Sequence, residues 1–176
     1  MKNRAPTPES SPAMTIAVGQ PLPQVTFRIT TSDGVEPRTT AEVFAGRTVL
    51  LFAVPGAFTP TCHRNHLPGY IQHAAAIRAA GVDVIAVTST NDPFVMEAWA
   101  RETGAGDAIL FLSDGNADFA RAVGLDVDAA ERGMGIRSQR YAMLVRDGIV
   151  ERLAVEEARG VVAASGAEAM LAALGG

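Results

Sequence analysis

The chain of 176 residues contains one cysteine, Cys62, which lies where the local sequence changes from a strand pattern to a helix pattern. The apolar run from Thr48 to Val54 predicts a buried strand, a turn rich in Pro and Gly follows at 55–60, and a helix pattern begins at about Thr61. Cys62 is therefore expected in the first turn of a helix, where unpaired backbone N–H groups and the helix dipole favour an anion. A thiol there is expected to lose its proton more easily than a free cysteine, and the thiolate is the nucleophilic form.

A lone cysteine also has an ordinary explanation, because free cysteine is among the most buried residue types and behaves as a small apolar side chain. The position of Cys62 is an argument for a catalytic role, since ligand sites in open α/β sheets lie at the carboxyl ends of strands. Position alone leaves the structural and the catalytic interpretations equally open.

The motif that contains this cysteine is more specific than its position. Residues 55–62, Pro-Gly-Ala-Phe-Thr-Pro-Thr-Cys, resemble the active-site segment of the peroxiredoxins, thiol peroxidases with a thioredoxin-like fold, and are most similar to the atypical type II (peroxiredoxin-five-like) subfamily. The family's characteristic Pro, Thr and Cys in one loop and its distant Arg are matched by Pro55, Thr59, Cys62 and Arg140. The resemblance covers most of residues 21–157, through the segments 66–70, 89–95, 112–114, 135–141 and 145–150.

The resemblance implies a role for each matched residue. Cys62 supplies the thiolate that attacks the peroxide, and the hydroxyl of Thr59 holds a peroxide oxygen and orients the thiolate. Arg140 is the permanently charged partner of the thiolate, and Arg137 is expected to support it. Pro55 shields the cysteine from bulk water. Without the resemblance, these residues are interpreted as a turn proline, a helix-capping threonine and solvated strand arginines.

The histidines near Cys62 suggest two other kinds of site. His66 lies four residues after Cys62 and is expected on the same helix face, so a Cys/His acyl-transfer dyad and a metal site both have to be considered. Neither is favoured, because the dyad has no evident third group to orient it and the chain has only three histidines and one cysteine. We expect His66 to be structural and to pack near the site, and His63 and His73 to be exposed.

The composition and charge are those of a globular protein. Hydrophobic residues make up 48% of the chain and charged residues 19%, and the formal net charge of -4 argues against a nucleic-acid or anionic-membrane surface. No apolar run approaches the ~20 residues of a membrane-spanning helix. One cysteine excludes an intramolecular disulfide, as suits a reducing compartment such as the cytoplasm.

The residue patterns predict one folded domain of the α/β class. Residues 1–14 are rich in Pro, Ser and Thr and predict a disordered tail, with a transit peptide as the weaker alternative, and residues 15–176 predict a single domain. Strands are expected at 25–30, 48–54, 82–88, 109–112, 140–145 and 149–154, and helices at 40–46 (capped by Thr40), 61–80, 92–103, 116–123 and, with Ser165 and Glu168 as a capping box, from 165 onward. Parallel strands with crossover helices, followed by an antiparallel hairpin, indicate a thioredoxin-like mixed sheet flanked by helices.

The expected function is a peroxidase cycle that requires no haem, flavin or metal. Cys62 reduces hydrogen peroxide or an alkyl hydroperoxide and becomes a sulfenic acid. Because the chain has no second cysteine, an external thiol must resolve the sulfenic acid, and glutathione with glutaredoxin is favoured over thioredoxin. The resemblance also implies a homodimer.

Two alternatives use the same cysteine. A thiol–disulfide oxidoreductase of this fold typically needs Cys-x-x-Cys, and Thr59 occupies the first cysteine position, which excludes a dithiol mechanism. A non-enzymatic redox sensor or chaperone-like module, in which oxidation of Cys62 only signals, stays open. Such a sensor shows one turnover with peroxide, whereas a peroxidase shows many.

Overall fold

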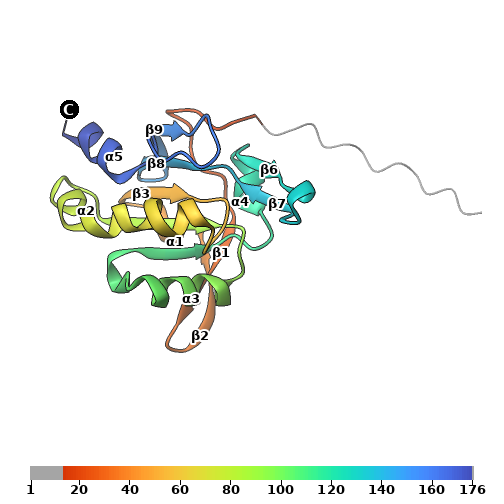
Figure 1. Ribbon diagram of the computed structural model, residues 1–176. Helices are drawn as coiled ribbons and strands as arrows, with labels where there is room; N and C mark the ends of the chain where they lie inside the picture. Colours follow the sequence, from red (N-terminus) through yellow and green to blue (C-terminus); the bar gives the residue numbers. More distant parts are fainter. Residues whose placement is uncertain (1–13, 176) are drawn as a thin grey trace, which may run out of the picture.

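The computed structural model describes residues 14–175 of the chain. Its centre is a seven-stranded mixed sheet with the strand order β2-β1-β5-β4-β3-β8-β9 (Figure 1). The strands of this sheet are β1 (Thr26–Thr31), β2 (Gly34–Thr39), β3 (Thr48–Ala53), β4 (Val84–Ser89), β5 (Leu110–Ser113), β8 (Tyr141–Arg146) and β9 (Ile149–Val155). Apart from Met14, the predicted disordered tail lies outside the described residues.

Strand β3 is buried along its whole length because helices cover both faces of the sheet. The helices are α1 (Thr40–Phe44), α2 (Leu67–Ala79), α3 (Pro93–Thr103), α4 (Asp118–Ala122) and α5 (Ala167–Leu174). Alternate side chains of a strand point to opposite faces. Leu50 and Phe52 therefore join one core with α2, α3 and α5, whereas Val49 and Leu51 join a second core with α1 and α4. Within residues 14–175, no helix has the length and apolar character needed to cross a membrane.

Capping and turn residues determine one helix start and one hairpin. The side chain of Asp92 caps α3 by accepting a hydrogen bond of 2.9 Å from the backbone N–H of Val95, and Pro93 is the first helical residue. Asp147 and Gly148 join β8 to β9 with φ angles of 47° and 76°. Both angles are left-handed, as a two-residue type I′ hairpin requires.

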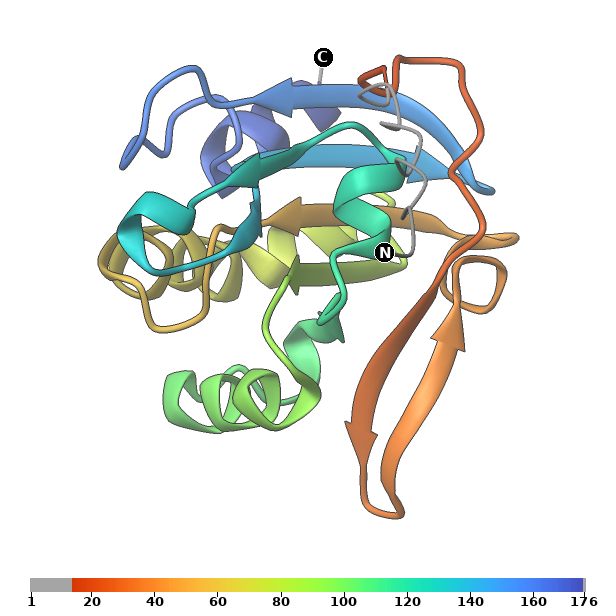
Figure 2. The ribbon, with the colours of Figure 1, turned by 90° about the vertical axis from the view of Figure 1, so that its right-hand side faces the viewer.

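Two antiparallel ribbons are not predicted by the sequence. β2 pairs with β1 in a hairpin that projects from the sheet (Figure 2). The residues of β2 are exposed or half-buried and include Pro37, so they lack the alternation that marks a half-buried strand. A separate ribbon pairs β6 (Asp126–Asp128) with β7 (Ile136–Ser138), and strands of three residues are too short to show a pattern.

The cap of α1 lies one residue earlier than predicted. Thr39, not Thr40, accepts a hydrogen bond from the backbone N–H of Glu42, whose carboxylate accepts from the backbone N–H of Thr39. The side chain of Thr40 is buried instead and donates to the carbonyl of Pro23 at 2.9 Å. Threonine is a good N-cap at either position, and the sequence cannot show which of the two side chains is buried and therefore unable to cap the helix.

The helix predicted at 61–80 is not one continuous α-helix. Cys62–His66 form a π-helical turn, η1, which is closed by a hydrogen bond from the backbone N–H of Leu67 to the carbonyl of Cys62. Helix α2 follows this turn. π turns are rare and occur frequently at functional sites. The prediction of an α-helical first turn at Cys62 was therefore wrong in its geometry, although it was right that a helix begins there.

The last helix also begins differently from the prediction. The N-cap of α5 is Gly166, which makes no side-chain capping bond, and Glu168 is exposed. Ser165 is fully buried, and its hydroxyl donates to the carboxylate of Glu156 at 2.8 Å. The predicted capping box between Ser165 and Glu168 is wrong because the serine hydroxyl binds Glu156, which directly follows β9.

Candidate active site

Cys62 lies just beyond the carboxyl end of β3, where the chain turns into η1. Its side chain has no exposed surface and belongs to the core shared by α2, α3 and α5. The location at a strand end agrees with the sequence-based expectation. Burial alone also fits the structural interpretation, so the neighbours of the sulfur atom decide between the two.

The guanidinium group of Arg140 contacts this sulfur. Arg140 directly precedes β8, and β8 runs antiparallel to β3 with Tyr141 opposite Ala53. The start of β8 therefore lies beside the end of β3. Arg140 Nη2 donates a hydrogen bond of 3.2 Å to Cys62 Sγ across 78 positions of sequence. The sheet register brings the two predicted catalytic residues together.

The charge of Arg140 is buried without a carboxylate partner. The residue is 8% exposed, and none of the ion pairs found within residues 14–175 involves it. A buried charge is costly unless it is paired and hydrogen-bonded. Cys62 Sγ accepts a hydrogen bond from this guanidinium, and a thiolate there would supply the opposite charge.

His66 is held between Arg140 and the segment before α5. Arg140 Nη1 lies 2.9 Å from His66 Nδ1, and His66 Nε2 lies 3.0 Å from the carbonyl oxygen of Ser165. Because arginine can only donate, Nδ1 is the acceptor, and the ring proton is on Nε2. Burial, followed by the positive charge of Arg140, lowers the pKa of His66 from 6.5 to about 4, against the opposing effect of the Ser165 carbonyl. The imidazole is neutral at physiological pH.

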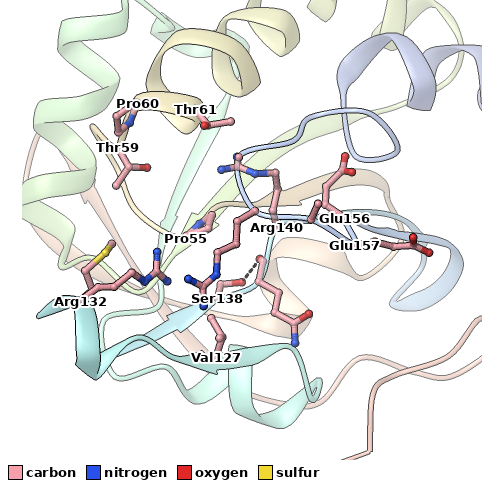
Figure 3. A pocket seen from close by; sticks show the side chains of 15 residues that line it. Pro55, Thr59, Pro60, Thr61, Val127, Arg132, Ser138, Arg140, Glu156 and Glu157 are labelled. Atoms are coloured by element: carbon pink, nitrogen blue, oxygen red, sulfur yellow. Dashed lines mark hydrogen bonds between the residues drawn. The ribbon is translucent and has the colours of Figure 1, made fainter.

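The predicted residues Pro55, Thr59 and Arg140 border one cavity of about 430 Å³ (Figure 3). The apolar side chains of Pro60, Val127 and Met134 line it as well. The cavity is therefore mostly apolar near its prolines and has an arginine at the position next to the sulfur.

The hydroxyl of Thr59 is already engaged. It donates a hydrogen bond of 2.7 Å to the carbonyl of Gly56, and no hydrogen bond between Thr59 and Cys62 occurs in the described structure. The carbonyl of Thr59 accepts from the backbone N–H of His63 at 2.9 Å. The expected direct contact that orients the thiolate is therefore not present. With its proton committed to Gly56, the hydroxyl can offer only lone pairs to another group.

Arg137 contacts the loop rather than Arg140. Its Nε donates to the carbonyl of Met134 at 2.7 Å, and its Nη1 reaches the carbonyl of Pro55 at 3.5 Å. A methyl group at Gly56 would lie 3.0 Å from Thr59 Cγ2 and 3.2 Å from Arg137 Nη1, so a side chain there would have to displace one or both of them. We find no hydrogen bond in the described structure between Arg137 and Arg140 that would let one support the other. Arg137 instead holds the loop that precedes Cys62.

The histidine predictions are met in part. His66 packs near the site as expected, but its hydrogen bond to Arg140 is not foreseen by the sequence, which contains no local signal for a partner 74 residues away. His63 and His73 are half-buried, not exposed. His63 Nδ1 accepts a hydrogen bond of 3.1 Å from Trp99 Nε1, which explains its burial.

Within residues 14–175, no three His, Cys, Asp or Glu side chains come together in a way that could hold a metal ion. The site combines a buried cysteine sulfur, a guanidinium that donates to it, a hydroxyl that can accept a hydrogen bond and a nearby cavity of small-molecule size.

Comparison with known proteins agrees with this arrangement. A protein-family model described as Redoxin matches residues 17–171. Chloroplastic peroxiredoxin-2E-2 of Oryza sativa subsp. japonica is 50% identical over 170 residues, which cover 94% of this chain and 75% of that protein. The hybrid peroxiredoxin hyPrx5 of Haemophilus influenzae is 46% identical over 138 residues, which cover 78% of this chain and 57% of that protein.

Solved structures of peroxiredoxins are also similar to this chain. Reduced Prx3 of Vibrio vulnificus, in complex with H₂O₂, superposes with a TM-score of 0.87 at 51% identity, covering 91% of this chain and 99% of that one. Peroxiredoxin 5 of Alvinella pompejana superposes with a TM-score of 0.80 at 31% identity, covering 91% and 98%. These matches confirm the predicted α/β fold class, with a thioredoxin-like mixed sheet flanked by helices.

The contacts of the two arginines predict different effects on the reactivity of Cys62. Arg140→Ala should slow alkylation of Cys62 by the uncharged reagent iodoacetamide at pH 7 by about tenfold or more, because the thiolate loses its buried counter-charge. Arg140→Lys should retain part of the rate, since it keeps the charge. Arg137→Ala should stay near the parent rate. A larger effect of Arg137→Ala than of Arg140→Ala would reverse the assignment.

The low pKa of His66 predicts a pH-dependent loss of stability. Unfolded His66 binds a proton below pH 6.5, whereas folded His66 stays neutral down to about pH 4. The folded state is therefore disfavoured as the pH falls from 6.5 to 4, by up to about 3 kcal/mol. Urea unfolding at pH 7, 5 and 4 should show that the stability advantage of the parent over His66→Gln shrinks with falling pH. An advantage that does not change with pH would contradict the neutral, buried imidazole.

Proposed function

The chain belongs to the peroxiredoxins, within the Redoxin family, and from this premise we propose that Cys62, Thr59 and Arg140 are the catalytic residues of a one-cysteine thiol peroxidase. Membership of this family is the evidence for the peroxidase activity. The observation that carries the residue assignment is the hydrogen bond from buried Arg140 Nη2 to Cys62 Sγ. Pro55 and Arg137 are assigned supporting roles in the loop that precedes Cys62.

The thiolate of Cys62 attacks one oxygen of the peroxide. A sulfur–oxygen bond forms while the O–O bond breaks, the sulfur is oxidised to a sulfenic acid, and the leaving oxygen is reduced and takes a proton to become water or an alcohol. Arg140 donates to the reacting atoms and stabilises the negative charge as it moves from sulfur to oxygen. The charge of arginine is permanent, so this stabilisation does not depend on pH.

Thr59 acts on the peroxide rather than on the sulfur. Because its hydroxyl donates to Gly56, it can accept a hydrogen bond from the O–H of the bound peroxide. One acceptor from Thr59 and donors from Arg140 together align the O–O bond with the sulfur. This alignment lowers the entropy cost of reaching the transition state.

Hydrogen peroxide and alkyl hydroperoxides are the proposed substrates. The relative from Vibrio vulnificus is described as a complex with H₂O₂. The cavity of about 430 Å³ is far larger than hydrogen peroxide needs, and its partly apolar lining suits an alkyl group. Cys62 has no exposed surface, so side chains at the cavity must shift to admit the peroxide, and Pro55 keeps bulk water from the sulfur.

The sulfenic acid is resolved by an external thiol. A thiol of glutathione attacks the sulfenic sulfur, water leaves, and a mixed disulfide forms; a glutaredoxin then attacks this disulfide and releases the Cys62 thiolate. Thioredoxin is the less favoured reductant, because a small thiol enters the cavity more easily. The single buried cysteine supports this route, since the chain offers no resolving partner.

We further propose a homodimer in the cytoplasm. The large side chains of Phe58 and Phe94 are 45% and 68% exposed, which supplies apolar surface for a second copy. A reducing compartment keeps a lone thiol available. Relatives named as chloroplastic make an organelle the alternative location.

Substitution of the nucleophile tests the assignment most directly. Cys62→Ser should abolish peroxide turnover while the circular dichroism spectrum stays that of the parent, because serine is nearly isosteric and a poor nucleophile. The parent should consume many equivalents of peroxide per chain when thiol is supplied. A parent that stops after one equivalent would support the redox-sensor function instead.

Loss of the Thr59 hydroxyl should impair peroxide reduction without unfolding the protein. Thr59→Val keeps the shape and should lower the second-order rate constant with hydrogen peroxide by about 10²-fold or more. Thr59→Ser retains the hydroxyl and should lie closer to the parent. If Thr59→Val lies within a factor of two of the parent, Thr59 takes no part in the mechanism.

Recycling can be followed by mass spectrometry. Oxidised protein treated with glutathione should carry one glutathione on Cys62, and glutaredoxin should remove it and restore turnover. Cys62→Ser is the control for adducts elsewhere. Accumulation of a Cys62–Cys62 linked dimer that thioredoxin alone reduces efficiently would refute this route of recycling and leave the peroxidase assignment intact.

A further inference from the structure

Four residues from distant parts of the chain form a closed ring of hydrogen bonds behind the sulfur. Arg140 Nη1 donates to His66 Nδ1 at 2.9 Å, and His66 Nε2 donates to the Ser165 carbonyl at 3.0 Å. The backbone N–H and the hydroxyl of Ser165 both donate to Glu156 Oε1, each at 2.8 Å. The backbone N–H of Glu156 donates to the Arg140 carbonyl at 3.0 Å, which closes the ring.

The ring lies largely inside the protein. Ser165, His66 and Arg140 are 0%, 1% and 8% exposed, whereas Glu156 is half-buried. The Ser165 carbonyl also accepts a hydrogen bond of 2.6 Å from the hydroxyl of Tyr70, so two donors fix its position. A buried network in which every member has its partners is rigid, because breaking one bond leaves a buried polar group unpaired.

Glu156 is the acidic member of the ring, and it also lines the cavity that Thr59 and Arg140 border. Its Oε1 accepts a third hydrogen bond, from the backbone N–H of Ala163 at 2.7 Å. Burial raises the pKa of Glu156, but the hydrogen bonds from Ser165 and Ala163 outweigh burial and lower it. Glu156 is therefore a carboxylate at neutral pH and holds residues 163–165, the segment before α5, in one position.

The orientation of Arg140 depends on this segment. A guanidinium group is planar and presents its donors in a fixed fork, so two acceptors define its plane. One acceptor is Cys62 Sγ and the other is His66 Nδ1. His66 is in turn oriented by the Ser165 carbonyl, and the position of that carbonyl depends on the bonds that Ser165 makes to Glu156.

We propose that Glu156 and Ser165 are positioning residues of the peroxidase, which hold His66 and thereby keep the Arg140 guanidinium in the orientation that binds the reacting sulfur and oxygen atoms. The proposal rests on the proposed function, in which Arg140 acts on the Cys62 thiolate and the peroxide. Neither Glu156 nor Ser165 touches the reacting atoms. Their effect reaches the sulfur only through His66 and Arg140.

Single substitutions give the first test. Glu156→Ala and Ser165→Ala should each lower the second-order rate constant for oxidation by hydrogen peroxide by roughly 10- to 100-fold, the cost of a small misplacement of a catalytic group. Glu156→Gln keeps an oxygen acceptor and should recover part of the rate. Glu168→Ala is the matched control, because Glu168 is exposed on α5 close to Ser165 in sequence and lies outside the ring. It should react like the parent.

Two readouts separate positioning from a loss of folding. The rates are measured well below the unfolding temperature of each variant, so a residue that only stabilises the fold leaves them unchanged. The second readout is the tautomer of His66, which nitrogen-15 NMR of the histidine rings reports. His66 in the parent should carry its proton on Nε2, and Glu156→Ala should show exchange between tautomers. An unchanged rate and an unchanged His66 tautomer in folded Glu156→Ala would overturn the proposal.

A double-mutant comparison identifies the route of the effect. In an Arg140→Ala background, Glu156→Ala should cause no further loss of the peroxide rate, because the group that it positions is absent. Losses that simply multiply would show that Glu156 acts independently of Arg140 and would overturn the proposal. The proposed function is tested separately by Cys62→Ser: if that variant keeps full turnover, the peroxidase assignment fails whatever Glu156 does.

Discussion

A guanidinium group buried beside a sulfur atom is the interaction on which the rest of the site depends. Arg140 lies inside the protein without a carboxylate partner in the described structure, and its Nη2 donates to Cys62 Sγ. Removing arginine from water costs several kcal/mol unless an opposite charge compensates it. A thiolate at Cys62 would supply that opposite charge, so the proposed nucleophile and the buried arginine would stabilise each other. Arg140 and Cys62 come close together because β8 begins beside the end of β3, with Tyr141 opposite Ala53.

The sequence predicts the chemistry better than it predicts the local geometry. Cys62, Thr59 and Arg140 could be proposed as catalytic residues because their types and spacing match a specific motif, and the apolar run of β3 predicts the strand that ends near them. The π turn at Cys62 could not be predicted, because no residue pattern distinguishes it from the start of an α-helix. Short or exposed elements such as β2 and β6 also give no pattern, since they bury too little to require one.

The parts of the site that the sequence misses are those made by long-range hydrogen bonds. Ser165 is followed three residues later by Glu168, which is the spacing of a capping box, yet its hydroxyl binds Glu156, just after β9. Arg137 is near Arg140 in sequence, but it lies on a different ribbon and holds the carbonyl of Pro55. Local spacing predicts local partners, and burial decides which partner a polar side chain finds.

The chemical character of His66 explains why an imidazole, not a carboxylate, lies next to Arg140. A carboxylate at this position would form an ion pair with the guanidinium and would compete with the thiolate for its charge. A neutral imidazole accepts one hydrogen bond from Arg140 and leaves the positive charge available to the sulfur. The carboxylate of Glu156 is bound to Ser165 instead, so it fixes the position of the histidine without forming an ion pair with the guanidinium of Arg140. The ring thus supplies rigidity from a charged anchor and leaves the full cation beside Cys62.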